Sequence, residues 1–249
     1  FNLSTMKEDW ETINNDDLKP LFNRAFGATY APGSTYKMCT LVAAMENVYQ
    51  KGEKAGQPIY SPGETIYDTG YFNHDDFADF HPTCLFYSSN RASHGDLTAQ
   101  DALKVSCNLF FYELGYRMTI EMMDDTAKGF GLGEPTGIEL TEKVGWRANK
   151  ESKKASYTGV DQAWNGGDRI LCAIGQSENR FTPLQLAVYV STLANQGTRY
   201  RATFLNRVTS SDYRTLVYSN SPEVVSKMNI SDTTYATYVD GMRRVVTME

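Results

Sequence analysis

The stretch Tyr30–Val48, YAPGSTYKMCTLVAAMENV, decides the fold because it places a turn directly before a largely apolar segment. Pro32 and Gly33 predict the turn, and the small and apolar residues after them recur with helical spacing. Such a wide apolar face is typical of a helix buried inside a domain. We therefore expect a buried helix from Ser34 to about Tyr49.

Ser34 and Lys37 lie three residues apart at the start of this helix, so one face carries both. One interpretation is a nucleophilic serine with a lysine base, since burial and the positive helix N-terminus keep a lysine neutral. The other is a helix-capping serine beside a lysine that extends into solvent. The same S-x-x-K spacing occurs at Ser4 and Lys7 in a polar segment, so only the apolar helix favours Ser34 as the nucleophile.

A second candidate motif is Ser106-Cys107-Asn108, which falls in a break between two predicted helices. The first helix is expected to end near Val105 and the next to begin near Asn108. In such a break the serine hydroxyl could relay a proton and the amide could hold a substrate carbonyl. The alternative is a plain helix end followed by a cap. The pattern also occurs at Ser88–Asn90, so it is not specific by itself.

The remaining patterns predict short strands among helices, an α+β layer architecture. Thr182, Pro183 and Gln185 predict a capped helix that ends at Gly197. The other expected elements are turns around two short strands in 51–70, an ordered loop over 71–95, a capping pair of Thr98 and Asp101, a helix over 119–131, a polar loop over 142–168, a hairpin over 202–219 and a helix from Ser231 or Asp232 to 247.

The composition is that of an ordinary globular domain of 249 residues, with 24 basic and 30 acidic side chains. Because no block of positive charge occurs, we expect no nucleic-acid partner. No apolar run is long enough to span a membrane. The first residues do not resemble a secretory signal, and the last, GMRRVVTME, lie in an amphipathic stretch without a helix stop. We therefore expect a longer protein, with any targeting segment outside this chain.

The four cysteines are widely spaced and form no C-x-x-C, so a zinc site of the usual spacing is not expected. The apolar surroundings of Cys39 and Cys172 predict core positions. Cys84 and Cys107 could form a disulfide in an exported protein, and their positions leave this open. Cys84 follows a loop with possible metal ligands, which we interpret as solvated side chains: His74, Asp75, Asp76, Asp79 and His81. We expect no metal and no cofactor, and His94 beside Gly95 is expected to serve a turn.

Taken together, the two motifs resemble those of the penicillin-binding proteins, which combine S-x-x-K with a second serine motif and K-T-G. The resemblance extends to longer stretches in the same order: KPLFNRAFGATYAPGSTYK (19–37), SHGDLTAQDALKVSCNLFFYELG (93–115), GFGLGEPTGIEL (129–140) and AIGQSENRFTPLQLAVYVSTLANQG (173–197). It covers roughly residues 18–249. The pattern is most similar to the monofunctional class B transpeptidases of cell elongation.

The resemblance implies the penicillin-binding transpeptidase fold, which is α+β, with a central antiparallel sheet flanked by helices and a mostly helical subdomain. No K-T-G occurs in the sequence. In this family that motif lies on a strand after the helix that DGMRRVVTME is expected to begin. We therefore expect residues 1–249 to be a single transpeptidase domain that is incomplete at its C-terminus.

The resemblance further implies a serine-type D-Ala-D-Ala transpeptidase or carboxypeptidase that acts on peptidoglycan stem peptides. Ser34 would be the nucleophile, Lys37 its base, Ser106 the proton relay to the leaving amine, and Asn108 a substrate-positioning residue. The implied partners are stem peptides ending in D-Ala-D-Ala, β-lactam antibiotics and other cell-wall elongation proteins. The implied location is the extracytoplasmic face of the bacterial membrane, with an N-terminal anchor outside this chain.

Two alternatives remain open from the sequence. A β-lactamase or a β-lactam sensor domain would share the Ser-Lys core, and rapid release of bound penicillin would favour the lactamase. A catalytically silent scaffold that binds other cell-wall proteins would follow if the whole protein lacked K-T-G. The stretch leading into Ser34 favours the transpeptidase.

Overall fold

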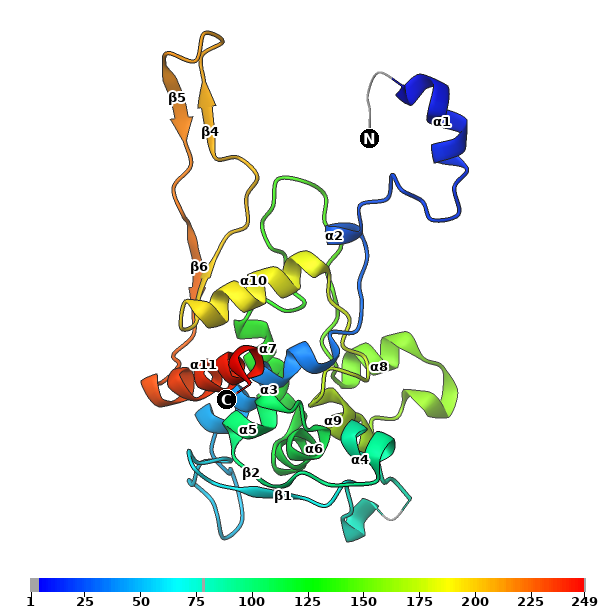
Figure 1. Cartoon of the computed structure of the whole chain (residues 1–249), viewed down its shortest axis with the longest axis vertical. Coiled ribbons are helices and arrows are strands. Elements are labelled where there is room, and N and C mark those ends of the chain that lie inside the picture. The colour runs from blue at the N-terminus through cyan, green and yellow to red at the C-terminus, as the bar shows by residue number, and fades with distance from the viewer. Residues whose placement is uncertain (1–4, 78, 249) are drawn as a thin grey trace.

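The chain forms one main helical body from which a long hairpin extends (Figure 1). A computed structural model describes residues 5–77 and 79–248. Most helices gather around α3 (Lys37–Glu46), whereas the hairpin of β4 (Arg207–Thr209) and β5 (Leu216–Ser219) extends away from them. Ser4 of the second S-x-x-K match lies outside the described residues.

The other α-helices are, in chain order, α1 (Met6–Asn14), α2 (Arg24–Gly27), α4 (Leu85–Asn90), α5 (Ala99–Lys104), α6 (Asn108–Arg117), α7 (Ile120–Gly129), α8 (Lys150–Ser156), α9 (Gly166–Cys172), α10 (Pro183–Ala194) and α11 (Asp232–Thr247). The 3-10 turns are η1 (Gly33–Tyr36), η2 (Asp75–Phe77) and η3 (Gly159–Gln162), and the remaining strands are β1 (Ile66–Asp68), β2 (Gly95–Leu97), β3 (Thr198–Tyr200) and β6 (Val224–Lys227). In the described part of the chain, no helix combines the length and the apolar character that crossing a bilayer requires.

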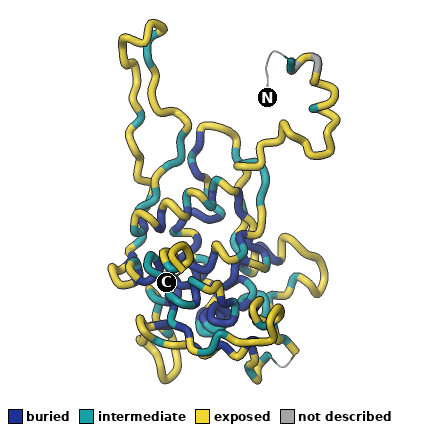
Figure 2. Tube along the Cα trace, in the orientation of Figure 1, coloured by how far each residue is buried: buried dark blue, intermediate teal, exposed yellow. Residues whose placement is uncertain are grey.

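Helix α3 is the centre of the core, as its apolar sequence predicts. Every side chain from Lys37 to Ala44 is buried, and α5, α6, α7 and α11 pack against the helix. Figure 2 shows that the buried residues gather in this body, whereas the hairpin is mostly exposed. The α-helix begins at Lys37 because the preceding residues form η1, and it ends at Glu46 rather than near Tyr49.

The predicted break between two helices is confirmed, and it lies between α5 and α6. Thr98 caps α5, because its hydroxyl accepts a hydrogen bond from the Asp101 N–H and donates one to the Asp101 carboxylate. Helix α6 begins at Asn108, as predicted. Between the two helices Ser106 has a φ of 52°, so its backbone adopts the left-handed conformation and the chain turns sharply.

Helix α10 confirms the capping pattern in its sequence. The Thr182 hydroxyl accepts from the Gln185 N–H, the Gln185 amide oxygen accepts from the Thr182 N–H, and Pro183 occupies the first turn. The chain leaves the helix through Gly197, whose φ is 88°. The last helix, α11, is capped by Ser231, again as predicted.

The strands within the described residues form three separate antiparallel pairs, β1–β2, β3–β6 and β4–β5. In β1–β2, Ile66 pairs with Leu97, and in the hairpin Arg207 pairs with Ser219. The hairpin prediction is therefore confirmed. Each strand is three or four residues long, and helices α5, α6, α7 and α11 cover α3.

Two segments that were predicted as loops contain helices. The 71–95 segment includes α4, and the 142–168 segment includes α8 and the start of α9. Helices α8 and α9 begin with capping boxes in which Asn149 pairs with Ser152 and Asn165 with Asp168. Helix α8 is polar and α9 is only seven residues long, so neither shows the repeated apolar spacing by which periodicity reveals a helix.

Candidate active site

Ser34 lies at an exposed position in η1, directly before the buried helix. Neither η1 nor α3 has a side-chain cap, so the interpretation of Ser34 as a helix cap is wrong. Its Oγ instead accepts a hydrogen bond from the Ser106 Oγ at 3.2 Å. The serine hydroxyl is therefore accessible and is joined to the second motif.

Lys37 is buried, with only 1% of its surface exposed, so the interpretation of a lysine extending into solvent is also wrong. Its Nζ donates to the Ser106 carbonyl at 2.7 Å, to the Ser106 hydroxyl at 3.0 Å and to the Asn108 Oδ1 at 2.7 Å. These acceptors match the three N–H groups of an ammonium. The structure thus brings together all four of the predicted site residues, Ser34, Lys37, Ser106 and Asn108.

The connection between Ser34 and Lys37 differs from the one that the spacing suggests. Among the described residues no hydrogen bond joins the Lys37 amine directly to the Ser34 hydroxyl. The Ser106 hydroxyl lies between them and contacts both groups. A proton can therefore move between Ser34 and Lys37 along this two-step chain.

Burial lowers the pKa of Lys37 to about 8, although the nearby thiols of Cys107 and Cys84 act in the opposite direction. The Phe111 ring lies 5.4 Å from Nζ and stabilises the remaining charged form by a cation–π contact. With a pKa near 8, about a tenth of the Lys37 side chains are neutral at pH 7. A neutral amine can accept a proton, as a catalytic base must.

This pKa predicts how the reactivity of Ser34 depends on pH. The rate of acylation should rise with pH and level off above about 8, because only the deprotonated Lys37 amine can accept the proton. Below the pKa the rate should fall about tenfold per pH unit. Second-order rate constants for acylation by a labelled β-lactam, determined from about pH 6 to about pH 9, measure this pH dependence. A flat profile across that range would contradict a role for Lys37 as the base.

The left-handed conformation of Ser106 is what presents both of its oxygens to Lys37. A non-glycine residue with this φ stores about 1–2 kcal/mol of strain. The Ser106 N–H donates to the Leu103 carbonyl and the Cys107 N–H to the Ala102 carbonyl, both within α5. These hydrogen bonds hold the strained turn in place.

Replacing Ser106 by Gly removes the hydroxyl but keeps the left-handed turn of the backbone, so the two contributions of Ser106 can be measured separately. Glycine adopts the left-handed conformation freely, so the free energy of unfolding should stay the same or rise by up to about 1 kcal/mol. Acylation of Ser34 should nevertheless slow by about 100-fold, since the link to Lys37 is removed. Thermal unfolding and β-lactam labelling of one sample measure both effects. Normal labelling of the stable S106G variant would exclude the hydroxyl from proton transfer.

The turn that carries Ser34 is fixed from its other side by the segment around Gly175. The Gly33 N–H donates to the Gly175 carbonyl at 3.0 Å, and a β-bridge joins Tyr30 to Phe181. Gly175 has a φ of 73°, and a Cβ at this position would lie 2.2 Å from the Gly33 carbonyl oxygen. Only glycine allows so close an approach. Its role follows from contacts with a distant turn, which the sequence does not reveal.

A cavity of about 820 Å³ opens in front of Ser34. Ser34, Ser106 and Asn108 lie in its wall together with Gln176. The segment that was predicted as an ordered loop supplies another part of the wall, and the residues that it contributes are Cys84, Leu85, Phe86, Ser89, Asn90 and His94. The cavity is large enough for a peptide substrate segment, and it exposes the reactive hydroxyl to that substrate.

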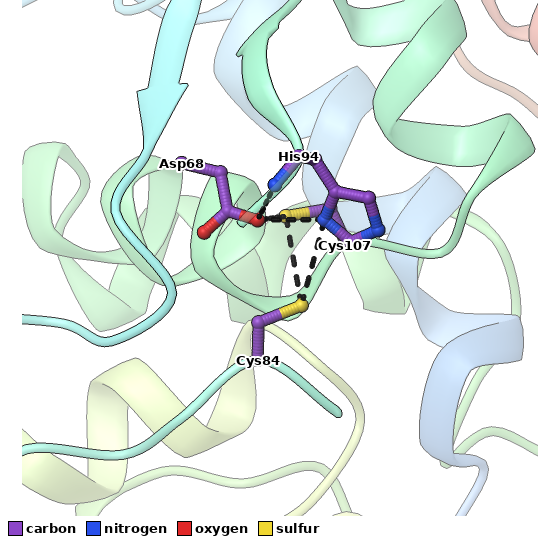
Figure 3. Close-up of side chains that lie close together, drawn as sticks. All are labelled: Asp68, Cys84, His94 and Cys107. Atoms are coloured by element: carbon purple, nitrogen blue, oxygen red, sulfur yellow. Dashed lines mark hydrogen bonds and ion pairs between the residues drawn. The ribbon is translucent and has the colours of Figure 1, made fainter. Parts of the chain in front are cut away.

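Cys84 and His94 of this wall belong, with Asp68 and Cys107, to a cluster of four groups that can hold a metal ion (Figure 3). One ligand atom from each lies within 4.8 Å of all the others. The His94 Nδ1 is 2.6 Å from the Asp68 Oδ2, and the Cys107 Sγ donates to the same oxygen at 3.4 Å. Two sulfurs, an imidazole and a carboxylate are ligands that zinc takes, at mutual distances of about 3–4 Å in a tetrahedral site.

The cluster differs from the candidate ligands that the sequence offered. His74 pairs with Glu113 at 2.9 Å, and its neighbours do not converge on one point among the described residues. His94, which was expected to serve a turn, belongs to the cluster instead. Successive members are 10 to 16 residues apart along the chain, and no motif spacing indicates them. Cys39 and Cys172 are buried in the core, as predicted.

The fold and the site are of the kind found in serine acyl-transfer domains, with an exposed serine linked through a second serine to a buried lysine. The chain belongs to the family described as the penicillin binding protein transpeptidase domain, whose model matches residues 3–249. The family resemblance of the sequence is therefore confirmed.

Curated relatives support the elongation-type group within this family. The chain is 34% identical over 190 residues to the peptidoglycan D,D-transpeptidase MrdA of Haemophilus influenzae, covering 76% of this chain and 27% of that protein. It is 28% identical over 228 residues to PbpA of Mycolicibacterium smegmatis, covering 89% of this chain and 40% of PbpA. The chain thus spans only about a quarter of MrdA.

Solved structures confirm the fold class. The penicillin-binding protein PBP2 of Helicobacter pylori matches 97% of this chain, which covers 41% of that chain, at a TM-score of 0.75 and 24% identity. PBP2 of Pseudomonas aeruginosa in complex with WCK 5153 matches 96% of this chain, which covers 47% of it, at a TM-score of 0.77 and 22% identity. The α+β penicillin-binding transpeptidase fold is therefore established.

Proposed function

We propose that this chain is the acylating part of a serine D,D-transpeptidase that cross-links peptidoglycan stem peptides. The observation that carries the proposal is the hydrogen-bonded chain from Lys37 through Ser106 to Ser34 at the wall of an open cavity. Membership of the transpeptidase family supports it. Residues 1–249 form a single domain in this proposal, and the K-T-G strand that the family uses is not part of the sequence.

In the acylation step the Ser34 Oγ attacks the carbonyl carbon of the penultimate D-Ala. Its proton passes to Ser106, whose own proton passes to the neutral Lys37 amine. The Ser34 N–H lies in the first turn of η1, where backbone N–H groups lack intrahelical acceptors, and it donates to the developing oxyanion. A donor of this kind is worth about 3–4 kcal/mol in the transition state.

The tetrahedral intermediate then collapses. The bond from the carbonyl carbon to the terminal D-Ala nitrogen breaks, and the leaving amine takes a proton from Lys37 through Ser106. The ester on Ser34 is next attacked by an amine of a second stem peptide, which loses a proton along the same path and restores the Ser34 hydroxyl. Water in place of that amine would give carboxypeptidase activity.

Asn108 has two roles in this proposal. Its Oδ1 accepts from the Lys37 ammonium, so it helps to position the base. Asn108 also lines the cavity, where its amide can donate to the peptide carbonyl of the bound donor strand. The residue thus connects substrate binding with the orientation of Lys37.

The partners follow from the family and from its solved members. β-Lactams should acylate Ser34 because they resemble the D-Ala-D-Ala amide, and a structure of penicillin-binding protein A from Mycobacterium tuberculosis is an imipenem acyl-enzyme complex. A PBP2 from Helicobacter pylori is solved in complex with MreC. We place this domain on the extracytoplasmic face of the bacterial membrane among elongation proteins, held by an N-terminal anchor outside this chain.

The test is D-Ala release from a stem pentapeptide by the intact protein, with a penicillin adduct followed in parallel. A transpeptidase should release D-Ala and keep the penicillin adduct for many minutes. Release of hydrolysed penicillin within seconds would identify a β-lactamase instead. An intact protein that forms no adduct and releases no D-Ala would support a silent scaffold and contradict the proposal.

A further inference from the structure

A second cavity lies beside the catalytic one, and the catalytic steps use none of its residues. It has a volume of about 370 Å³ and is formed by α8, η3, α9 and the segment after α9, at one side of the helical body (Figure 1). The buried or half-buried polar residues in its floor are Lys153, Asp168, Ser177 and Glu178, and the exposed residues at its mouth include Tyr157 and Val160. Such a volume suits a small ring rather than a protein partner.

The charged groups in this floor have hydrogen-bonding capacity that the protein does not use. Lys153 and Glu178 are only 8% and 7% exposed. An ammonium can donate three hydrogen bonds, yet among the described residues the Lys153 Nζ donates to the Asp168 carboxylate alone. The Glu178 carboxylate accepts a hydrogen bond from the Ser177 hydroxyl and from no other described group. Because buried polar groups normally have partners, the remaining donors and acceptors point to a polar ligand in the cavity.

The charges and the apolar surfaces of the cavity favour a neutral ligand that is rich in hydroxyls. Lys153 and Asp168 balance each other as an ion pair, and the Glu178 carboxylate repels an anion. A cation would in turn meet the Lys153 ammonium. The Tyr157 ring, which is 45% exposed, and the Leu171 side chain add apolar surface beside these polar groups. A sugar ring matches this mixture, because its hydroxyls donate and accept hydrogen bonds while its C–H groups pack against an aromatic face.

A short ridge of backbone separates this cavity from the catalytic one. Gln176 lines the catalytic cavity, and Ser177 lines the second. The ridge contacts the turn of the nucleophile, since the Gly175 carbonyl accepts from the Gly33 N–H at 3.0 Å. Consecutive Cα atoms are about 3.8 Å apart, so the Cα atom of Ser177 lies within about 8 Å of that of Gly175. An extended peptide of about four residues spans about 13–14 Å, so a peptide bound at Ser34 can carry a group into the second cavity.

The ridge is held from behind, so the two cavities keep a fixed separation. The buried Asn179 amide donates to the Gln176 carbonyl at 3.2 Å and to the Cys172 carbonyl at 3.4 Å. The Arg180 Nη1 donates to the Ser177 carbonyl at 2.9 Å. Ser177 itself has a φ of 59°, which turns the chain from one cavity toward the other. This arrangement suits one ligand with parts in both cavities.

We propose that the second cavity is a subsite for the glycan of the donor strand, and that its ligand is an N-acetylated hexosamine ring. This subsite rests on the proposed function, because a stem peptide that acylates Ser34 is attached to such a sugar at its other end. Glu178 accepts hydrogen bonds from the hydroxyls of the sugar, Lys153 donates to its oxygens, and the ring packs against Tyr157. The protein therefore prefers stem peptides that carry their glycan over free stem peptides.

The experiment compares D-Ala release by the intact protein from two substrates. One is a free stem pentapeptide, and the other is the same peptide linked to its disaccharide of N-acetylglucosamine and N-acetylmuramic acid. We expect kcat/KM for the glycan-linked peptide to be at least about fivefold higher, which is the effect of one net hydrogen bond. The readout is the ratio of the two values, because a loss of folded protein lowers both and leaves their ratio unchanged. Equal values for the two substrates would overturn the proposal.

Two variants locate the preference in this cavity. Tyr157→Ala removes the aromatic face and should reduce the ratio by at least about threefold. Glu178→Gln keeps the volume of the side chain but removes the charge that strengthens hydrogen bonds from hydroxyls, so it should also reduce the ratio. Tyr213→Ala is the matched control and should keep the wild-type ratio, since Tyr213 is 85% exposed in the hairpin turn and lines neither cavity. A wild-type ratio in Tyr157→Ala or in Glu178→Gln would contradict the subsite.

Binding of the sugar alone separates the subsite from the reaction. The probe is the trisaccharide of N-acetylglucosamine, and saturation-transfer NMR with the intact protein detects its contact. We expect transfer to the trisaccharide in the wild type and in Tyr213→Ala, and at least about threefold less in Tyr157→Ala. If neither peptide releases D-Ala, the proposed function fails, whereas the trisaccharide signal still reports on the subsite. No transfer in the wild type, or equal transfer in Tyr157→Ala, would overturn the subsite.

Discussion

Lys37→Met should slow acylation of Ser34 by a labelled β-lactam about 10³-fold. Methionine fills a similar volume in the core but provides no amine, so the proton of Ser34 has no acceptor at the end of the Ser106 relay. The rate of acylation should fall further than in S106G, because a water molecule can replace the missing Ser106 hydroxyl but not the missing Lys37 base. Stopped-flow labelling of the intact protein measures the rate.

The variant also leaves the Ser106 carbonyl and the Asn108 amide oxygen without their donor, which should lower the free energy of unfolding by about 1–3 kcal/mol. Thermal unfolding must therefore show that K37M is folded at the temperature of the assay. Lys104→Met is the matched control, since this lysine ends α5 and is not among the residues that line the cavity, and it should label at the wild-type rate. A folded K37M variant that labels as fast as K104M would remove Lys37 from the mechanism.

Ser34→Ala should abolish the covalent adduct completely and D-Ala release with it. The Ser34 side chain is exposed and makes one hydrogen bond, so the free energy of unfolding should change by less than about 0.5 kcal/mol. The loss of labelling can then be assigned to chemistry rather than to folding. Denaturing gel electrophoresis after incubation with a fluorescent penicillin detects the adduct.

Ser211→Ala provides the control for this second variant, because Ser211 lies in the exposed turn of the hairpin, away from the cavity. It should label as the wild type does. A fluorescent band in S34A of wild-type strength would mean that another residue carries the acyl group. The same result would contradict the assignment of the S-x-x-K motif at Ser34.

Much of the fold near the site could be predicted from local sequence. The apolar face after Ser34, the capping box at Thr182 and the cap at Ser231 act within one or two helical turns, so their residues predict the structure directly. The break at Ser106 was predicted from the sequence as well. The burial of Lys37 followed from the apolar helix that carries it.

The features that were missed depend on contacts between distant segments. Cys84, His94 and Asp68 are brought together by the β1–β2 pair and the start of α4, and no periodicity in the sequence records that arrangement. A serine at position 106 does not indicate a left-handed φ, because glycine or asparagine is the residue that usually adopts this conformation. The spacing of Ser34 and Lys37 suggested a direct contact, whereas the structure places a hydroxyl between them.

The most direct test of the central claim is the position of the β-lactam adduct in the wild-type protein. Trypsin cleavage should release residues 25–37, AFGATYAPGSTYK, which contain Ser34 as their one serine. Tandem mass spectrometry of the labelled intact protein should place the added mass of the opened β-lactam on Ser34. An adduct on any other residue, or no adduct on the folded wild-type protein, would contradict the account.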